Sequence, residues 1–146
     1  MANYSIREFT ASIDKWIASA EKGLEFAVEE MCREVHKALV MGSPVDTGRF
    51  RGNWQVTLNK IPLHALNNYD KAGNKTIAAG ENVINGMFRR GAAVTSVHFS
   101  NMLIYANALE YGHSKQAPNG VVGIVALRLR SYMAEAIRKS RALNGL

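Results

Sequence analysis

The sequence is poor in residues that form cross-links and sharp breaks, with one cysteine and three prolines among 146 residues. A single cysteine excludes a disulfide within the chain, and the helical, apolar surroundings of Cys32 predict a buried thiol. No apolar run approaches the roughly 20 residues that a membrane-spanning helix needs. Glu8 and Asp14 stand where a signal peptide would carry its hydrophobic stretch. We therefore expect a protein that is made and kept in a cytoplasm, without a membrane partner.

The sequence also lacks the patterns of common catalytic and cofactor sites. No serine occupies a glycine-flanked nucleophile elbow, and no glycine-rich loop ends in the lysine and hydroxyl residue of a phosphate site. Asp46 and Glu110 could pair as acid and base, but two carboxylates in so short a chain coincide by chance more often than they form an active site. We expect no catalytic residues, no cofactor and no metal, since no pair at helical ligand spacing occurs among His36, His64, His98 and His113.

The composition is that of a folded globular domain, with 47% apolar and 21% charged residues. At this length, residues 1–146 fit a single domain. Its charge is unevenly divided, because residues 1–42 carry five basic and seven acidic side chains, whereas residues 43–146 carry thirteen basic and five acidic ones. Such asymmetry is typical of contact with nucleic acid or with an acidic partner, and equally of a solvated basic face.

A long amphipathic helix is predicted for the N-terminal part, from about residue 6 to residue 42. Its apolar residues recur every three or four positions, which places them on one face. Ser5 and Glu8 have the spacing of a capping box at its start, while Gly42 and Pro44 mark its end. Gly23 could divide it into two helices.

The remaining periodicities predict an α+β fold with a small, mostly antiparallel sheet and a C-terminal helix packed on it. Alternation predicts a strand over residues 54–59, and β-branched and aromatic residues predict a second over 94–101. Looser helical spacing predicts a helix over 76–88 and a stronger pattern predicts one over 120–143. Residues 60–75 are expected to be a long connection without regular structure.

Residues 43–54 form a predicted corner after the first helix. The run Ser43 to Gly48 contains turn residues whose side-chain oxygens can bond nearby amides, and a glycine that accepts a positive φ. Arg49 and Arg51 flank Phe50 just beyond it, so the corner also presents two guanidinium groups to carboxylates or phosphates. Turn chemistry alone explains most of this segment.

Residues 105–120 read as one or two helical turns that stop at Gly112, followed by a polar loop. Glu110 has Lys115 and the corner arginines as possible partners, while Tyr105 and Tyr111 offer amphipathic surfaces of the kind enriched at interfaces. An ordinary capped loop fits the same residues equally well.

Together these two segments resemble the neck and tail-completion proteins of long-tailed bacteriophages, a family of tail components. The resemblance is carried by PVDTGRFRGNW at residues 44–54 and by LEYGHSKQAP at residues 109–118, which follows Tyr105-Ala106 and closes with Gly120. Weaker matches lie at Asn101, at Tyr69-Asp70, at Thr76-Ile77 and at Gly80. The family covers terminators, completion factors and connectors, which these motifs do not separate.

The resemblance implies a structural virion protein with a tail-terminator-like fold, without catalysis. It further implies a ring of copies, usually a hexamer, at the neck of the virion between the connector or head-closure proteins and the tail tube, assembled in the host cytoplasm. The candidate subunit-interface residues are Asp46, Arg49, Arg51, Trp54, Tyr105, Glu110, Tyr111, His113 and Lys115.

Four arginines in the predicted last helix are candidates for a lumen through which the genome passes. Contact there would be with phosphate and independent of base sequence. Basic residues also suit a helix C-terminus through the helix dipole, which requires no nucleic acid. A non-specific nucleic-acid-binding protein is the alternative function, and the lumen candidates are Arg128, Arg130, Arg138 and Arg141.

Overall fold

The computed structural model describes residues 6–89 and 93–144, so Ser5 of the expected capping pair lies outside it. The fold is α+β, as predicted from the sequence. The elements in chain order are α1 (Ile6–Met41), the 3₁₀ turn η1 (Arg51–Asn53), β1 (Trp54–Leu58), α2 (Asn74–Asn85), β2 (Val97–Asn101), α3 (Ala106–Glu110) and α4 (Val122–Asn144). Within the described ranges, no helix is both long and apolar enough to cross a membrane.

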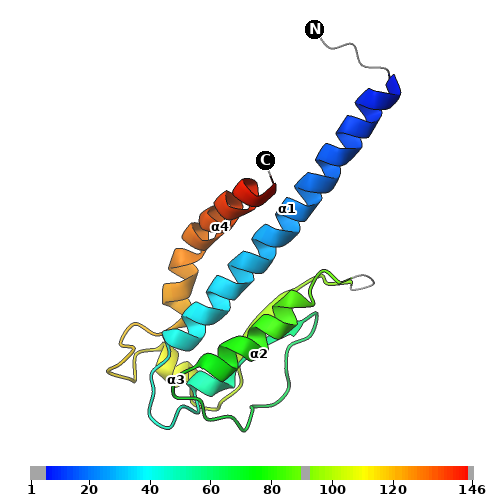
Figure 1. The fold of residues 1–146 in the computed structure, drawn as a ribbon. Coiled ribbons are helices and arrows are strands. Elements are labelled where there is room, and N and C mark those ends of the chain that lie inside the picture. The colour runs from blue at the N-terminus through cyan, green and yellow to red at the C-terminus, as the bar shows by residue number, and fades with distance from the viewer. Residues whose placement is uncertain (1–5, 90–92, 145–146) are drawn as a thin grey trace.

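The two long helices lie side by side and run in opposite directions (Figure 1). α1 is continuous through Gly23, and its 36 residues make it about 54 Å long, whereas the 23 residues of α4 span about 35 Å. The N-terminal part of α1 therefore extends beyond the end of α4 (Figure 1). α4 packs chiefly on α1, whereas the sequence analysis expected it on the sheet.

The main core lies where the C-terminal half of α1 meets the start of α4 and the corner. It includes Val35 and Leu39 of α1, Val125 of α4, and Phe50 and Trp54. Burying an aliphatic or aromatic side chain of this kind contributes about 1.5–3 kcal/mol before entropy is subtracted. The hydrophobic face of α1 is thus the common wall to which the other elements attach.

The sheet consists of two antiparallel strands, with Trp54 opposite Asn101 and Leu58 opposite Val97. Trp54 and Val56 point to the same side and are both buried, as the period of two predicts. Val56 joins Cys32, Ile84 and Met87 in a second core between the sheet, α1 and α2. Burial raises the pKa of the Cys32 thiol to about 11, which makes it a poor nucleophile.

Asp70 fixes the start of α2. This helix begins at Asn74, two residues before the start predicted from the sequence. The Asp70 carboxylate accepts hydrogen bonds from the amides of Gly73 (3.0 Å) and Thr76 (2.9 Å) and from the Thr76 hydroxyl (2.8 Å). Burial of this carboxyl acts to raise its pKa, but these hydrogen bonds, with the charge of Lys75, lower it below its ordinary value. An anionic acceptor thus satisfies the first amides of α2.

α1 and α2 cross where His36 meets Gly80. The His36 side chain is buried, and its Nε2 donates to the Thr76 carbonyl oxygen at 2.9 Å. Its Nδ1 has no hydrogen-bond partner among the described residues, which fits a neutral ring. A Cβ at Gly80 would overlap the imidazole. The missing side chain at Gly80 therefore sets how closely the two helices approach.

Replacing Gly80 with alanine should lower the free energy of unfolding by about 1–3 kcal/mol, because the added methyl overlaps the His36 ring. Urea unfolding would measure the loss. Gly86→Ala is the matched control, since a Cβ there has no neighbour closer than 3.5 Å. Equal stability of the two variants would contradict the close crossing.

Stability should fall as the pH drops below about 6.5, where histidine is protonated in the unfolded chain. Burial lowers the pKa of His36 in the folded state, and the hydrogen bond to Thr76 and the charge of Glu81 offset only part of this. The folded protein therefore binds the proton later, and the loss is complete below its folded pKa. Urea midpoints between pH 5 and 8 should show a reduced slope in His36→Gln but not in the exposed control His64→Gln.

Candidate functional site

Residues 43–54 and 105–120 meet at the end of the molecule opposite the N-terminus (Figure 1). Gln116 joins them, because its side-chain oxygen accepts from the Val45 amide and its nitrogen donates to the Val45 carbonyl, both at 2.9 Å. The Gln116 side-chain amide therefore pairs with the Val45 backbone through two hydrogen bonds, as backbone groups pair between two β-strands. We call this joined region, residues 43–54 with residues 105–120, the tip.

Glu110 holds the first turn of α4. Its carboxylate accepts hydrogen bonds from the amides of Val121 (2.9 Å), Val122 (2.5 Å) and Gly123 (3.2 Å). A negative charge at a helix N-terminus also complements the helix dipole. Gly120 has φ +79° and lies so close to Glu110 that a Cβ would overlap the carboxylate. Glu110 and Gly120 together therefore define where α4 begins.

Arg51 connects the corner to the end of α1 and to the loop before α2. Its guanidinium donates to the carbonyl oxygens of Lys71 (2.7 Å), Met41 (3.1 Å) and Ser43 (3.1 Å). It thereby satisfies a carbonyl at the end of α1 and ties the loop before α2 to it. This arginine is committed to the fold of its own chain.

Ser43, Asn53 and Trp54 of the corner are also engaged internally. The Trp54 indole donates to the Ser43 hydroxyl at 2.7 Å, and that hydroxyl donates to the Leu39 carbonyl. The fully buried Asn53 side chain donates to the Arg49 carbonyl and accepts from the Leu66 amide at 2.7 Å. These bonds anchor the connection over residues 60–73 to the corner.

A cleft of about 470 Å³ lies between the two segments of the tip. Phe50 is at its inner wall and contacts Trp54 edge-on, with ring centroids 5.8 Å apart, and Tyr105 at 6.4 Å. Exposed aromatic and charged groups surround it, namely Asp46, Arg49, Tyr69 and Tyr105. The cleft has the mixed polar and aromatic character of an interaction surface rather than of a proton-transfer site.

The predicted interface residues divide into two groups. Arg51, Trp54 and Glu110 direct their polar groups to their own chain. The exposed group can still reach a partner, and Tyr111 is the most exposed aromatic in it, at 82%. Its members are Asp46, Arg49, Tyr105, Tyr111, His113 and Lys115. The Glu110 carboxylate, which the sequence offered as a possible partner of Asp46, accepts three backbone hydrogen bonds at the start of α4.

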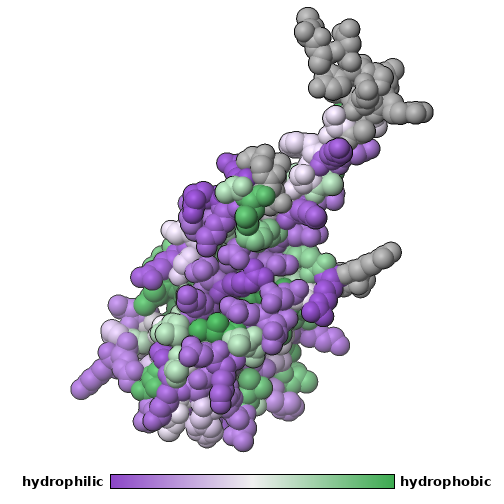
Figure 2. All heavy atoms as spheres, in the orientation of Figure 1, coloured by the Kyte–Doolittle hydropathy of each residue, from purple (hydrophilic) through white to green (hydrophobic). Residues whose placement is uncertain are grey.

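The four arginines of α4 are all exposed, but they do not form one stripe. Arg128 lines a shallow groove beside Gly42 and Tyr132, while Arg141 lines a different groove beside Trp16. Arg138 forms a paired contact with Glu135, which lowers the pKa of that carboxyl. Figure 2 shows a largely hydrophilic surface over this part of the molecule.

Gln116, Asn53 and Asp70 lie in segments that carry the motif resemblance, but their structural roles were not predicted. Gln116 and Asn53 act through backbone groups far away in the chain, and Asp70, which is outside the tip, caps a helix from four residues upstream of its first residue. Asp70 could have been found as an acidic residue shortly before a helix start. Among the described residues, no group of three histidine, cysteine, aspartate or glutamate side chains is placed to hold a metal.

Glu110→Ala should lower the free energy of unfolding by about 1–2 kcal/mol, the usual cost of losing a helix cap. Asp46→Ala removes a carboxylate from the exposed side of the same tip and should change it by less than about 0.5 kcal/mol. Urea unfolding followed by circular dichroism would compare them. If both variants were as stable as the starting protein, the capping role of Glu110 would be wrong.

The sequence matches no family model, and no curated protein and no solved structure is found to be similar to the chain.

Proposed function

We propose that the chain is a structural subunit of a bacteriophage neck, forming a ring of copies that completes the tail and joins it to the head. The observation that supports this best is the tip. The two segments that resemble the neck and tail-completion proteins, although about 60 residues apart in the sequence, are joined by Gln116 and Val45 into one surface.

Within the tip, some side chains hold the fold and others remain exposed, which suits a surface for assembly. Arg51, Glu110 and Gln116 hold backbone groups at fixed positions. Around this frame, Arg49, Tyr111, His113 and Lys115 remain exposed. Rigid presentation of aromatic and basic groups lowers the entropy cost of binding a partner.

A closed ring requires two different complementary surfaces on each subunit. The chain supplies groups of opposite sign, since residues 1–42 carry an excess of acidic side chains and residues 43–146 a larger excess of basic ones. Complementary charge would favour association in one orientation. A hexamer, with connector or head-closure and tail-tube proteins as neighbours, is the assembly that the motif resemblance suggests.

Reversing the charge of Arg49 tests the tip as an interface. Arg49→Glu should abolish ring formation in electron microscopy and light scattering, because the exposed side chain would then repel an acidic partner. Arg89→Glu makes the same change at an exposed arginine outside the tip and should leave the rings unchanged. Arg51→Glu is unsuitable, since it would break three backbone hydrogen bonds.

Rings of ordinary size from Arg49→Glu would exclude this residue from the interface. A purified protein that stays monomeric at high concentration and never forms rings would count against the proposed function itself.

Non-specific binding of nucleic acid remains the second candidate, supported by the exposed arginines of α4. It requires a shift of double-stranded DNA at micromolar protein that weakens steeply with added salt. The joint replacement of Arg130, Arg138 and Arg141 by glutamine would reduce this binding. An unchanged affinity in that variant would remove α4 as the DNA-contacting element.

A further inference from the structure

The N-terminal part of α1 carries large apolar side chains that are exposed to water. Trp16 is 64% exposed and Leu24 is 68% exposed, and Ile13 and Ile17 are also exposed. Their spacing of three and four residues places them on one face of the helix. Single exposed apolar residues are ordinary, but a contiguous stripe of this kind marks a contact surface. We call these four residues the α1 stripe.

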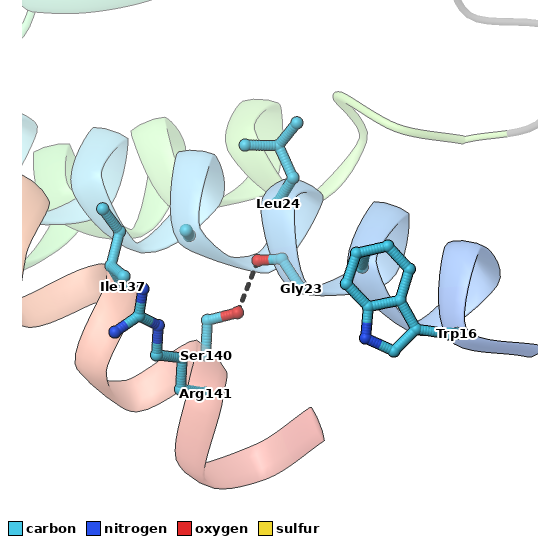
Figure 3. A pocket seen from close by; sticks show the side chains of 8 residues that line it. Trp16, Gly23, Leu24, Ile137, Ser140 and Arg141 are labelled. Atoms are coloured by element: carbon cyan, nitrogen blue, oxygen red, sulfur yellow. Dashed lines mark hydrogen bonds between the residues drawn. The ribbon is translucent and has the colours of Figure 1, made fainter. Parts of the chain in front are cut away.

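Two hollows lie beside α4, one toward the start of α1 and one toward the tip. The first, of about 470 Å³, lies between Trp16, Leu24 and Ile137, with the Ser140 hydroxyl donating to the Gly23 carbonyl at its floor (Figure 3). The second, of about 380 Å³, is lined by apolar side chains. That second hollow is lined by residues of α1, β2 and α4, among them Met31, Val35, Phe99, Ala126 and Leu129. We call the two hollows together the α4 groove.

The charges beside these two surfaces are complementary. Asp14, Glu21 and Glu25 follow one another along a single edge of the α1 stripe, because successive helix positions differ by about 100°. The α4 groove is bordered by Arg141, which lines it, and by Arg130, which lies about three turns earlier on the same side of α4. An acidic edge and a basic border of similar length favour a head-to-tail contact.

We propose that the α4 groove receives the α1 stripe of a second copy of this chain. The inference rests on the proposed ring for its partner, and it adds where the copies touch. The stripe and the groove share Trp16 and Leu24 at one end of the groove but otherwise consist of different residues, so the contact is heterologous and repeats from subunit to subunit until it closes. The mode is that of an amphipathic helix laid into an apolar groove, with anchors at helical spacing.

A symmetric pairing of two α1 stripes is less favourable. It would leave the acidic edge of each stripe without a basic partner, because Lys15 and Lys22 lie on the opposite side of α1 from that stripe. It would also leave the apolar hollow beside Phe99 and Leu129 exposed to water. The head-to-tail contact covers both surfaces at once.

Cysteine cross-linking distinguishes these arrangements. In a Cys32→Ala background, Ile17→Cys and Met133→Cys would be placed on separate chains, one of them carrying a tag that changes its size. On mixing and oxidation, we expect a disulfide-linked dimer of one tagged and one untagged chain, and a ladder of covalent oligomers from the double variant. Leu127→Cys replaces Met133→Cys as the control, because this 87% exposed residue lies on another side of α4.

Dimers formed by Ile17→Cys alone would overturn the proposal in favour of symmetric pairing. Linkage to Met133→Cys no faster than to Leu127→Cys would also overturn it. Trp16→Ser should weaken self-association at least tenfold in sedimentation or light scattering, with an unchanged circular dichroism spectrum, since the exposed indole contributes little to the isolated fold. Full association of this variant would argue against the contact.

The same experiment separates this inference from the proposed function. Closed rings in electron microscopy without the cross-link from Ile17 to Met133 would reject the groove contact and leave the ring intact. The cross-link in open chains that never close would support the groove contact and reject the ring.

Discussion

The arrangement of this protein depends on the hydrogen bonds between the Glu110 carboxylate and the first amides of α4. They set where α4 begins and the direction in which it leaves the tip. From that start Val121 and Val125 reach the core against α1. The antiparallel pair of long helices, and the groove along it, follow from this one anchored end.

The same kind of contact recurs wherever the chain changes direction. Asp70 holds the start of α2 and Arg51 holds the end of α1, each through several backbone groups. A sheet of two strands supplies few ladder hydrogen bonds and is marginal by itself. Side chains that bind helix ends therefore replace the stabilisation that a larger sheet would provide.

The hydrogen bonds within the tip show which residues of the two motifs serve the fold of the chain itself. Some of the residues that stand out at positions 44–54 and 105–120 support the fold, because the side chains of Glu110 and Arg51 form hydrogen bonds with backbone groups of their own chain. Their exposed neighbours, such as Arg49 and Tyr111, are the ones available to a partner. Two exposed regions result, the tip at one end and the α1 stripe near the other. The proposed role, in which the chain joins neighbours in a ring and also contacts other proteins, needs such separate surfaces.

The sequence predicted the elements well where periodicity was strong. α1 was expected to about residue 42 and ends at Met41, and the strand expected at residue 54 begins there. The predictions were less accurate where a distant contact decides the boundary. α2 begins before residue 76 because of Asp70, and β2 begins at Val97 because its length is set by pairing with β1.

For the candidate site, the sequence located both segments of the tip but not the bonds that join them. Gln116 and Val45 are 71 residues apart, and no local pattern marks a side-chain amide as the partner of a distant peptide group. Gly80 was noted only for its resemblance, although its role is to make room for His36. Contacts of this kind depend on which helix faces meet, which is a property of the folded chain.

The sequence by itself determined the helical stripes, the strand alternation, the turn residues of the corner and the uneven charge, because each is set by neighbours within a few positions. Only the tertiary structure decided that α4 lies on α1, that Glu110 is a cap, and that the start of α1 extends beyond the end of α4 (Figure 1). These depend on long-range packing and on which polar groups are left unsatisfied once the core has formed.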